Sequence, residues 1–133
     1  MKKGFVTLTI LLMFASFAFA AGDRFSKVDA NRDGKISKQE YLDEAAAKFD
    51  RLDQNKDGAL SRDEIRKVYS LDPVKMLKEI DTDHDGKISK EEFLRAAEMN
   101  FLKTDKNKDG SISKKEWDRS RKSKDPMFVL FRF

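Results

Sequence analysis

A twelve-residue pattern of acidic, amide and small side chains occurs four times in this chain of 133 residues. Each copy has aspartate at positions 1 and 5, aspartate or asparagine at position 3, glycine at position 6, serine at position 9 and glutamate at position 12. The copies are residues 29–40, 53–64, 81–92 and 105–116. One such match could occur by chance in an acidic loop, but four copies with every position filled indicate a true internal repeat.

The spacing inside the repeat suits a hard divalent cation. Ca²⁺ takes about six to eight oxygen ligands at about 2.3–2.6 Å, so the chain must turn oxygen-bearing groups inward at alternating positions. Glycine at position 6, Gly86 in the third copy, permits the sharp bend. We expect Ser89 at position 9 to hold a coordinating water, and the Lys87 side chain to point away. The predicted ligands of this copy are Asp81, Asp83, Asp85, the backbone carbonyl of Lys87, and Glu92.

The other three copies offer oxygen ligands at the same positions 1, 3, 5, 7 and 12. Asp83 stands where the other copies have asparagine, so the third copy has one more carboxylate and is predicted to fill first. Mg²⁺ is expected to compete weakly, because it demands near-octahedral geometry and gives up water reluctantly. The predicted ligands are Asp29, Asn31, Asp33, Lys35 and Glu40 in the first copy, Asp53, Asn55, Asp57, Ala59 and Glu64 in the second, and Asp105, Asn107, Asp109, Ser111 and Glu116 in the fourth.

On these residues the repeat resembles the calcium loop of the EF-hand superfamily, to which calmodulin belongs. The chain is similar to small exported bacterial proteins with four such loops. The resemblance implies an all-α array of helix–loop–helix units over residues 21–122, with up to four Ca²⁺ ions. It also implies short antiparallel bridges between paired loops at position 8, which is occupied by Ile36, Leu60, Ile88 and Ile112.

The distances between the copies predict helices that neighbouring loops share. Too few residues separate the first loop from the second, or the third from the fourth, for two helices and a turn. A single helix from about Lys38 to Leu52 would be roughly 22 Å long and would hold its two loops at opposite ends. Apolar residues recur at helical spacing in both segments. They are Tyr41, Ala45, Phe49 and Leu52, and then Phe93, Ala97 and Phe101.

Loops at opposite ends of one helix cannot bridge each other, so we expect a nested pairing of the second loop with the third and the first with the fourth. Asp72-Pro73 in the middle linker is predicted to end one helix and begin the next. Val74, Leu77 and Ile80 are then expected to face inward. The alternative is the conventional pairing of the first loop with the second and the third with the fourth, which would bring Ile36 against Leu60.

Residues 1–20 have the features of a secretory signal peptide. Lys2 and Lys3 precede an apolar run, and Ala18-Phe19-Ala20 fits the rule for cleavage. The alternative, an uncleaved anchor, is disfavoured because the run is shorter than the ~20 residues needed to span a bilayer. We therefore expect a periplasmic or extracellular protein without a transmembrane span after cleavage.

Composition narrows the possible partners. The chain has no cysteine, so disulfides cannot stabilise it, and bound ions are expected to supply much of the folding free energy. The formal charge of +4 falls to +2 without residues 1–20, because that segment has two lysines and no acidic residue. Many basic residues stand at outward loop positions, which favours a solvated face over nucleic-acid binding.

The C-terminal segment, residues 123–133, departs from the repeat. Residues 124–126 are predicted to end the exit helix of the fourth loop, and residues 127–133 are almost wholly apolar. We expect the segment to pack into a groove lined by Phe49, Phe101 and Trp117, since a free tail of this composition would aggregate. Anchoring of a partner or a membrane, or a frayed end, are the alternatives.

The sequence favours a binding function over catalysis. The only histidine, His84, stands at a loop position that usually faces water, and the chain has neither a cysteine nor a Ser/His/Asp set to act as nucleophile. We expect a constitutively loaded calcium buffer or a calcium-stabilised binding module. The alternative is a calmodulin-like sensor that exposes an apolar groove to a protein partner, beside Trp117 or the tail. Export and the scarcity of methionine disfavour it.

Overall fold

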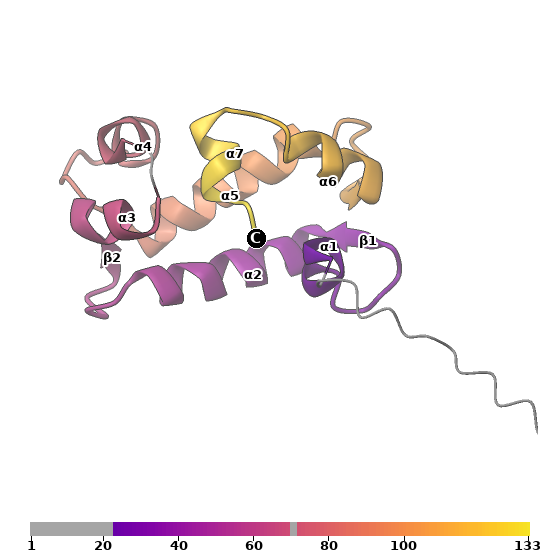
Figure 1. Cartoon of the computed structure of the whole chain (residues 1–133), viewed down its shortest axis with the longest axis horizontal. Coiled ribbons are helices and arrows are strands. Elements are labelled where there is room, and N and C mark those ends of the chain that lie inside the picture. The colour runs from indigo at the N-terminus through magenta and orange to yellow at the C-terminus, as the bar shows by residue number, and fades with distance from the viewer. Residues whose placement is uncertain (1–22, 70–71) are drawn as a thin grey trace, which may run out of the picture.

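Two long helices that lie side by side organise the molecule (Figure 1). In the computed structural model, which describes residues 23–69 and 72–133, they are α2 (Lys38–Leu52) and α5 (Lys90–Thr104). The predicted signal peptide lies outside the described residues. Shorter helices precede and follow the long ones: α1 (Arg24–Val28), α3 (Arg62–Val68), α4 (Pro73–Ile80), α6 (Lys114–Ser120) and α7 (Pro126–Leu130).

Each of the two long helices begins directly after one loop and ends at the next. Ser37 caps the start of α2 and forms a capping box with Glu40. At the other end of the helix, the Asp53 amide donates to the Phe49 carbonyl. The α5 helix is built in the same way between Ser89 and Asp105. Serine and glutamate in this spacing satisfy the free amides of a first helical turn. The prediction of helices shared between loops is confirmed, with the expected bounds for the first.

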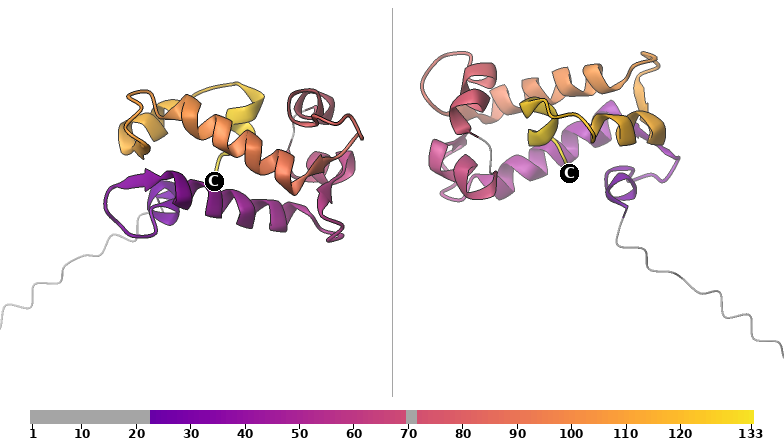
Figure 2. Two further views of the ribbon diagram at one scale, coloured as in Figure 1. Left: turned by 180° about the vertical axis from the view of Figure 1, so that it is seen from behind. Right: turned by 45° about the horizontal axis from the view of Figure 1, so that its top comes forward.

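Two short antiparallel sheets join the loops across the helix pair. In one, β1 (Lys35–Ser37) pairs with β4 (Ser111–Ser113), so that Ile36 lies opposite Ile112. In the other, β2 (Ala59–Leu60) pairs with β3 (Ile88–Ser89), with Leu60 opposite Ile88. The nested pairing is confirmed and the conventional one is wrong. Because α2 leads from β1 to β2 while α5 leads from β3 to β4, the two helices run antiparallel (Figure 2).

The Asp-Pro pair in the middle linker starts α4 as expected, but one inward residue was wrongly predicted. The Asp72 side chain accepts from the Val74 amide, and Pro73 occupies the first turn. Leu77 and Ile80 are buried, whereas Val74 is 54% exposed. Met76 takes its place in the core. Val74 and Met76 flank the Leu77–Ile80 line on opposite sides of the helix, and the core lies on the side of Met76.

A second Asp-Pro pair has the same role near the C-terminus. The prediction that residues 124–126 end the exit helix is wrong, because α6 already ends at Ser120. Asp125 instead caps α7 by accepting from the Met127 amide, and Pro126 begins the helix. Asp-Pro is a start signal at both places, since proline lacks the amide that a first turn leaves free.

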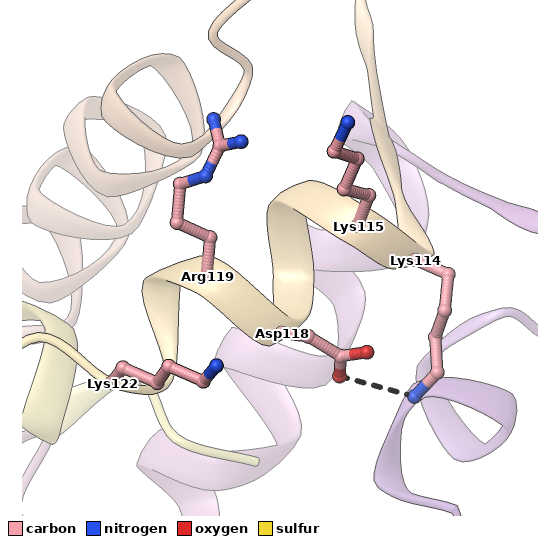
Figure 3. A pocket seen from close by; sticks show the side chains of 5 residues that line it. All are labelled: Lys114, Lys115, Asp118, Arg119 and Lys122. Carbon is pink, nitrogen blue, oxygen red and sulfur yellow. Dashed lines mark hydrogen bonds and ion pairs between the residues drawn. The ribbon is translucent and has the colours of Figure 1, made fainter.

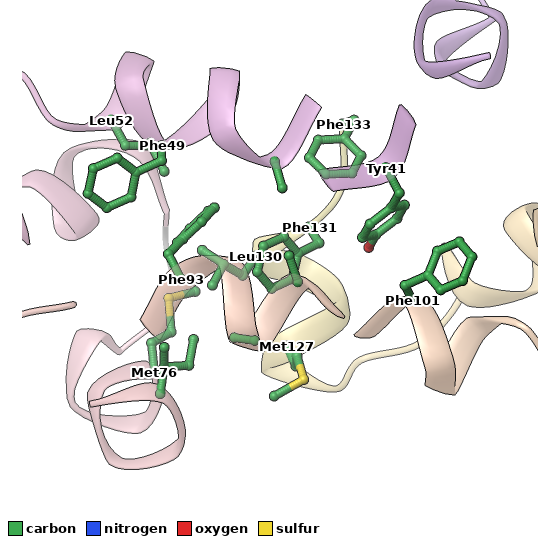
Figure 4. Close-up of a cluster of buried hydrophobic side chains, with 14 of the residues drawn as sticks. Tyr41, Phe49, Leu52, Met76, Phe93, Phe101, Met127, Leu130, Phe131 and Phe133 are labelled. Carbon is green, nitrogen blue, oxygen red and sulfur yellow. The ribbon is translucent and has the colours of Figure 1, made fainter. Parts of the chain in front are cut away.

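The C-terminal segment covers the core between the two long helices (Figure 4). The Phe131 ring lies 4.9 Å from Phe93 and 6.5 Å from Tyr41, and Phe133 stacks on Trp117 at 6.3 Å between centroids. The expected contact with Trp117 is therefore present. Phe49 and Phe101 were also expected to line the groove. The Phe49 ring packs against Phe93 and the Phe101 ring against Tyr41, so both lie behind the rings that contact the segment.

Among the described residues, we find no helix that combines the length and the apolar character needed to cross a membrane.

Truncation of the central ring layer tests this packing. Phe93→Ala should lower the free energy of unfolding in urea by about 3–5 kcal/mol, because Phe93 is fully buried and contacts rings on both sides. Leu102→Ala, on the same helix but 60% exposed, is the matched control and should change stability by at most about 0.5 kcal/mol. Equal losses in the two variants would contradict the assignment of the core.

Candidate functional site

The four loops share one backbone path. The residue at position 4 has positive φ in every loop, with values of 59°, 57°, 62° and 57° at Arg32, Lys56, His84 and Lys108. The glycine two residues later is also left-handed, and Gly86 has a φ of 86°. Side chains other than glycine are strained there, which explains the residue type at position 6. His84 is exposed, as its loop position predicted.

The aspartate at position 1 folds each loop around its carboxylate. In the third loop, Asp81 Oδ1 accepts from the Asp85 amide at 3.2 Å, and Oδ2 accepts from the Gly86 amide at 2.9 Å. The other three loops repeat both hydrogen bonds. All four side chains are buried, at 4–7% exposure, although they carry ionisable groups. They are Asp29, Asp53, Asp81 and Asp105.

Positions 3 and 5 complete a cluster of oxygen atoms. In the third loop, one carboxylate oxygen each of Asp81, Asp83 and Asp85 lies within 4.8 Å of the others. Three carboxylates this close repel one another unless a cation lies among them. Their oxygens are the ligand type that hard divalent ions prefer, so the residues present fit Ca²⁺.

The asparagine at position 3 changes the charge balance of the other three loops. The Asn55 side-chain amide donates to Asp57 Oδ2 at 3.2 Å, and the first and fourth loops have the same contact at 3.1 and 3.0 Å. An internal amide donor thus satisfies one oxygen of the position-5 aspartate in these loops. In the third loop, Asp83 has no such donor to offer.

The glutamate at position 12 joins the two ends of each loop. In the third loop, Glu92 Oε1 accepts from the amides of Thr82 at 2.7 Å and Asp83 at 3.3 Å, while Oε2 accepts from the amide and hydroxyl of Ser89. Sequence reasoning assigned Ser89 to a water and missed this role as a helix cap. The Ser-x-x-Glu spacing was the available signal.

These contacts also set the acidity of the glutamates. Burial alone would raise the pKa of Glu92, but the hydrogen bonds from Ser89 and Thr82 outweigh it and lower the pKa to about 2. The pKa of each corresponding glutamate in the other loops is lowered in the same way, against burial, by its serine and the loop amides. The Thr82 hydroxyl donates to Oε1 of Glu92 at 2.9 Å. The other loops have alanine, glutamine or lysine at position 2, and none of these side chains has a hydroxyl. Each glutamate is therefore charged at neutral pH.

Paired loops also contact each other through lysine side chains. The Lys87 side chain points away from its own loop, as expected, and its Nζ lies 3.0 Å from Asp57 Oδ2 in the paired second loop, a partner that the sequence analysis did not predict. Lys35 makes the equivalent contact with Asp109 of the fourth loop at 3.6 Å. The β-bridges make both contacts possible. They place position 7 of one loop opposite position 9 of its partner, and from there the lysine side chain reaches the aspartate at position 5 of that partner. The hydrogen bond from Lys87 lowers the pKa of Asp57.

All twenty predicted ligand residues lie within the described part of the chain, five in each loop. The structure brings the five members of every set onto one loop. No predicted set is divided between distant parts of the molecule. The position-7 residues Lys35, Ala59, Lys87 and Ser111 lie at the start of, or directly before, the short strands.

A basic surface on α6 lies outside the loop interiors (Figure 3). A hollow of about 590 Å³ is lined by four cationic side chains and one carboxylate. Lys114 Nζ is 3.2 Å from Asp118 and 3.0 Å from Asp23 of the N-terminal region. These groups are exposed, so the surface agrees with a solvated face that offsets the acidic loops. The lining residues are Lys114, Lys115, Asp118, Arg119 and Lys122.

Comparison with known families covers all four loops. A model described as an EF-hand domain pair matches residues 43–98, and a model described as an EF hand matches residues 22–43 and 101–119. The matched pair contains the second and third loops, which are also joined by a β-bridge in the structure. Among curated proteins, none matches the chain.

Removal of one hydroxyl tests how the loop holds its glutamate. In the calcium-free protein, Thr82→Val should raise the pKa of Glu92 from about 2 toward its ordinary value, which carboxyl NMR titration would detect. A lowered carboxyl pKa stabilises the fold above about pH 4.5, and this stabilisation is lost as the pH falls toward 2. Acid unfolding of the variant should therefore begin at higher pH. Glu64 is the internal control, and an unchanged Glu92 titration would contradict the role of Thr82.

Substitution of the two cross-loop lysines tests the contact between loops. Lys87→Gln should raise the pKa of Asp57 and leave Asp109 unchanged, because the donor to Asp57 is lost. Lys35→Gln should raise the pKa of Asp109 by less, since that pair is longer and the Ser111 hydroxyl is the main donor to Asp109. NMR titration of both aspartates in each variant gives the comparison. Shifts at both sites in both variants would indicate a general charge effect instead.

Proposed function

Since the chain belongs to the EF-hand calcium-binding superfamily, we propose that it binds up to four Ca²⁺ ions, one in each loop, as a constitutively loaded buffer or calcium-stabilised binding module. The family matches imply calcium binding and point to a non-catalytic protein. The observation that carries the proposal is the backbone path common to all four loops, together with the three carboxylate oxygens of the third loop that lie within 4.8 Å of one another.

Each loop would hold its ion with the side chains at positions 1, 3, 5 and 12 and the carbonyl at position 7. Bound Ca²⁺ supplies positive charge that neutralises the clustered carboxylates. The chain supplies the geometry, because loop amides already orient the first carboxylate, as at Asp81. The position-12 glutamate, such as Glu92, links the ion to the first turn of the exit helix. Ion binding and helix stability are thereby coupled.

The third loop is proposed to bind its ion first. It has a carboxylate at Asp83 where the other loops have an amide. An amide at this position also donates to the neighbouring aspartate, as Asn55 does to Asp57, and a ligand oxygen engaged in this way is less available to an ion. Greater ligand charge raises EF-hand affinity. Mg²⁺ is proposed as the weaker competitor at all four loops.

The buffer or stabilised-module role is favoured over a sensor role by the packing of the C-terminal segment. A sensor uses calcium to expose an apolar groove. Here Leu130, Phe131 and Phe133 are buried on the helices that would form such a groove. We also propose export to the periplasm or the exterior, on the signal-like residues 1–20, where abundant calcium would keep the loops filled. A calmodulin-like sensor is the second candidate, favoured by the apolar character of the covered surface.

Calorimetric titration of the protein with Ca²⁺ tests the proposal. Wild-type protein should bind four ions with a gain of helix and a falling signal from an apolar-surface dye. Glu92→Gln should lower the number of tightly bound ions by one and remove the earliest binding step. Glu40→Gln, Glu64→Gln and Glu116→Gln should each lose one of the later steps. Fewer than four bound ions in the wild type would contradict the stoichiometry, and a rising dye signal would favour the sensor.

A matched substitution tests the order of filling. Asp83→Asn gives the third loop the ligand charge of the others, so its binding step should weaken and merge with the later ones. Asn55→Asp adds a carboxylate to the second loop, whose binding step should strengthen. Titration with Mg²⁺ present should show the same ranking. An unchanged first step in Asp83→Asn would show that loop rigidity, not charge, sets the order.

A further inference from the structure

A buried lysine on α2 has its ammonium group directed at the C-terminal segment. Lys48 is 9% exposed, and its Nζ donates to the carbonyl of Leu130 at 2.6 Å and to that of Arg132 at 2.9 Å. Among the described residues it forms no ion pair with a carboxylate. A buried cation without a carboxylate is costly unless other groups compensate for lost water. Here those groups belong to residues 130–132.

One of the two carbonyls, that of Leu130, is among those that a helix end leaves free, and that of Arg132 lies two residues beyond the helix. The α7 helix ends at Leu130, and the last carbonyls of a helix lack partners within it. Tyr69 also donates to the Leu130 carbonyl, at 3.1 Å. The Lys48 ammonium lies 5.4 Å from the Tyr69 ring and 5.3 Å from the Phe133 ring, within the range of cation–π attraction. A cation and a hydroxyl on the body of the protein thus bind the C-terminal end of a short helix.

The apolar side chains of the segment have the spacing of a helix seated in a groove. Met127, Leu130 and Phe131 are buried at i, i+3 and i+4, and Phe133 follows. The groove is lined by rings from α2, α5 and α6, and Figure 4 shows Tyr41 of α2 and Phe93 of α5 beside the segment. We call this surface, together with the two polar groups above, the tail receptor. It consists of Tyr41, Lys48, Tyr69, Phe93 and Trp117.

The fit of the segment leaves polar groups unsatisfied. Trp117 Nε1 and Arg132 Nε are buried without a hydrogen-bond partner among the described residues. A buried donor without an acceptor destabilises the packed state, because it has lost its hydrogen bonds to water. The seated segment is therefore held mainly by its apolar side chains and the Lys48 contacts, and a helix that offered an acceptor to Trp117 would bind the same surface better.

We propose that the tail receptor is a binding site for a short apolar helix, and that residues 126–133 occupy it as a built-in ligand of the same chain. The proposal rests on the proposed function, because the receptor is built on the helices that carry the calcium loops. It adds that calcium loading leaves the site closed. A protein partner must present a helix with the same apolar spacing and displace the segment.

The surroundings of Lys48 make the contact depend on pH. Burial, and to a smaller extent the nearby guanidinium of Arg51, lower the pKa of Lys48 to about 7, while Glu44 acts in the opposite direction. Arg24 and Lys27 add smaller effects of the same sign as Arg51. Because this pKa is below the ordinary 10.5, the docked state binds fewer protons than the undocked state between about pH 7 and 10.5. Docking should strengthen as the pH rises through that range, because a neutral amine keeps both hydrogen bonds to the carbonyls and avoids the cost of burying a charge.

The single tryptophan reports directly on the seated segment. Trp117 is the only tryptophan of the chain, is 2% exposed, and stacks on Phe133. In the full-length calcium-loaded protein, the double variant Phe131→Asp/Phe133→Asp should shift Trp117 emission to longer wavelength and increase binding of an apolar dye. Val129→Asp is the matched control, because Val129 is on α7 but outside the buried core. It should leave both signals unchanged.

Rescue in trans separates a binding site from an ordinary core. A synthetic peptide of residues 124–133, added to the double variant, should restore Trp117 emission and lower the dye signal. Circular dichroism must show that the variant keeps its helices. Absence of rescue in a helical variant, or an equal response of Val129→Asp, would overturn the proposal. Concentration-dependent dimers of wild type, formed by exchange of the segment, would overturn occupation within one chain.

A second variant covers the case in which the double variant does not fold. Trp117 emission of wild type should report stronger docking from pH 7 to 10, and Lys48→Met should lose this dependence. Persistence of the dependence in Lys48→Met would overturn the role of Lys48. Calcium stoichiometry is measured on the same samples. Loss of calcium binding with intact docking would reject the proposed function alone, and the reverse result would reject the tail receptor alone.

Discussion

The arrangement of the molecule depends on two backbone bridges, one between Ile36 and Ile112 and one between Leu60 and Ile88. A helix of fifteen residues separates the loops at its ends by roughly 22 Å, so the loops of one helix cannot join each other. Each loop pairs instead with a loop of the other long helix. The antiparallel course of α2 and α5 follows from these two pairings, and with it the location of the core between them.

The same bridges bring charged groups of different loops together. Lys87 reaches Asp57 across one bridge, and Lys35 reaches Asp109 across the other. Both contacts involve a predicted ligand aspartate of the neighbouring loop. An ion bound in one loop as proposed would therefore compete with a lysine from the paired loop. Both groups are exposed, so the contact changes the relative strength of the sites more than the stability of the fold.

The glutamate at position 12 gives each loop a second function. It closes the loop through the amides of positions 2 and 3 and caps the exit helix with its serine. Loop geometry and helix initiation thus share one side chain, and this explains why helices as short as α3 and α6 begin at a defined residue. The C-terminal segment contributes to stability in a different way, by covering apolar surface that paired helices leave open.

Local pattern in the sequence was sufficient for most of the fold and for the positions of the loops that form the candidate site. Ligand spacing within twelve residues, the distance between loops and the Asp72-Pro73 signal are short-range features, and they predicted the loops, the shared helices and the nested pairing. Contacts between distant residues decided the rest. Periodicity alone could not choose between Val74 and Met76, because the choice depends on which side of α4 meets the core. The partner of Lys87 lies thirty residues away, and Lys48 meets the carbonyl of Leu130 across a separation of 82 residues. Only the tertiary structure brings such groups together. Their contact depends on how whole helices pack, and no regular spacing of residues in the sequence indicates it.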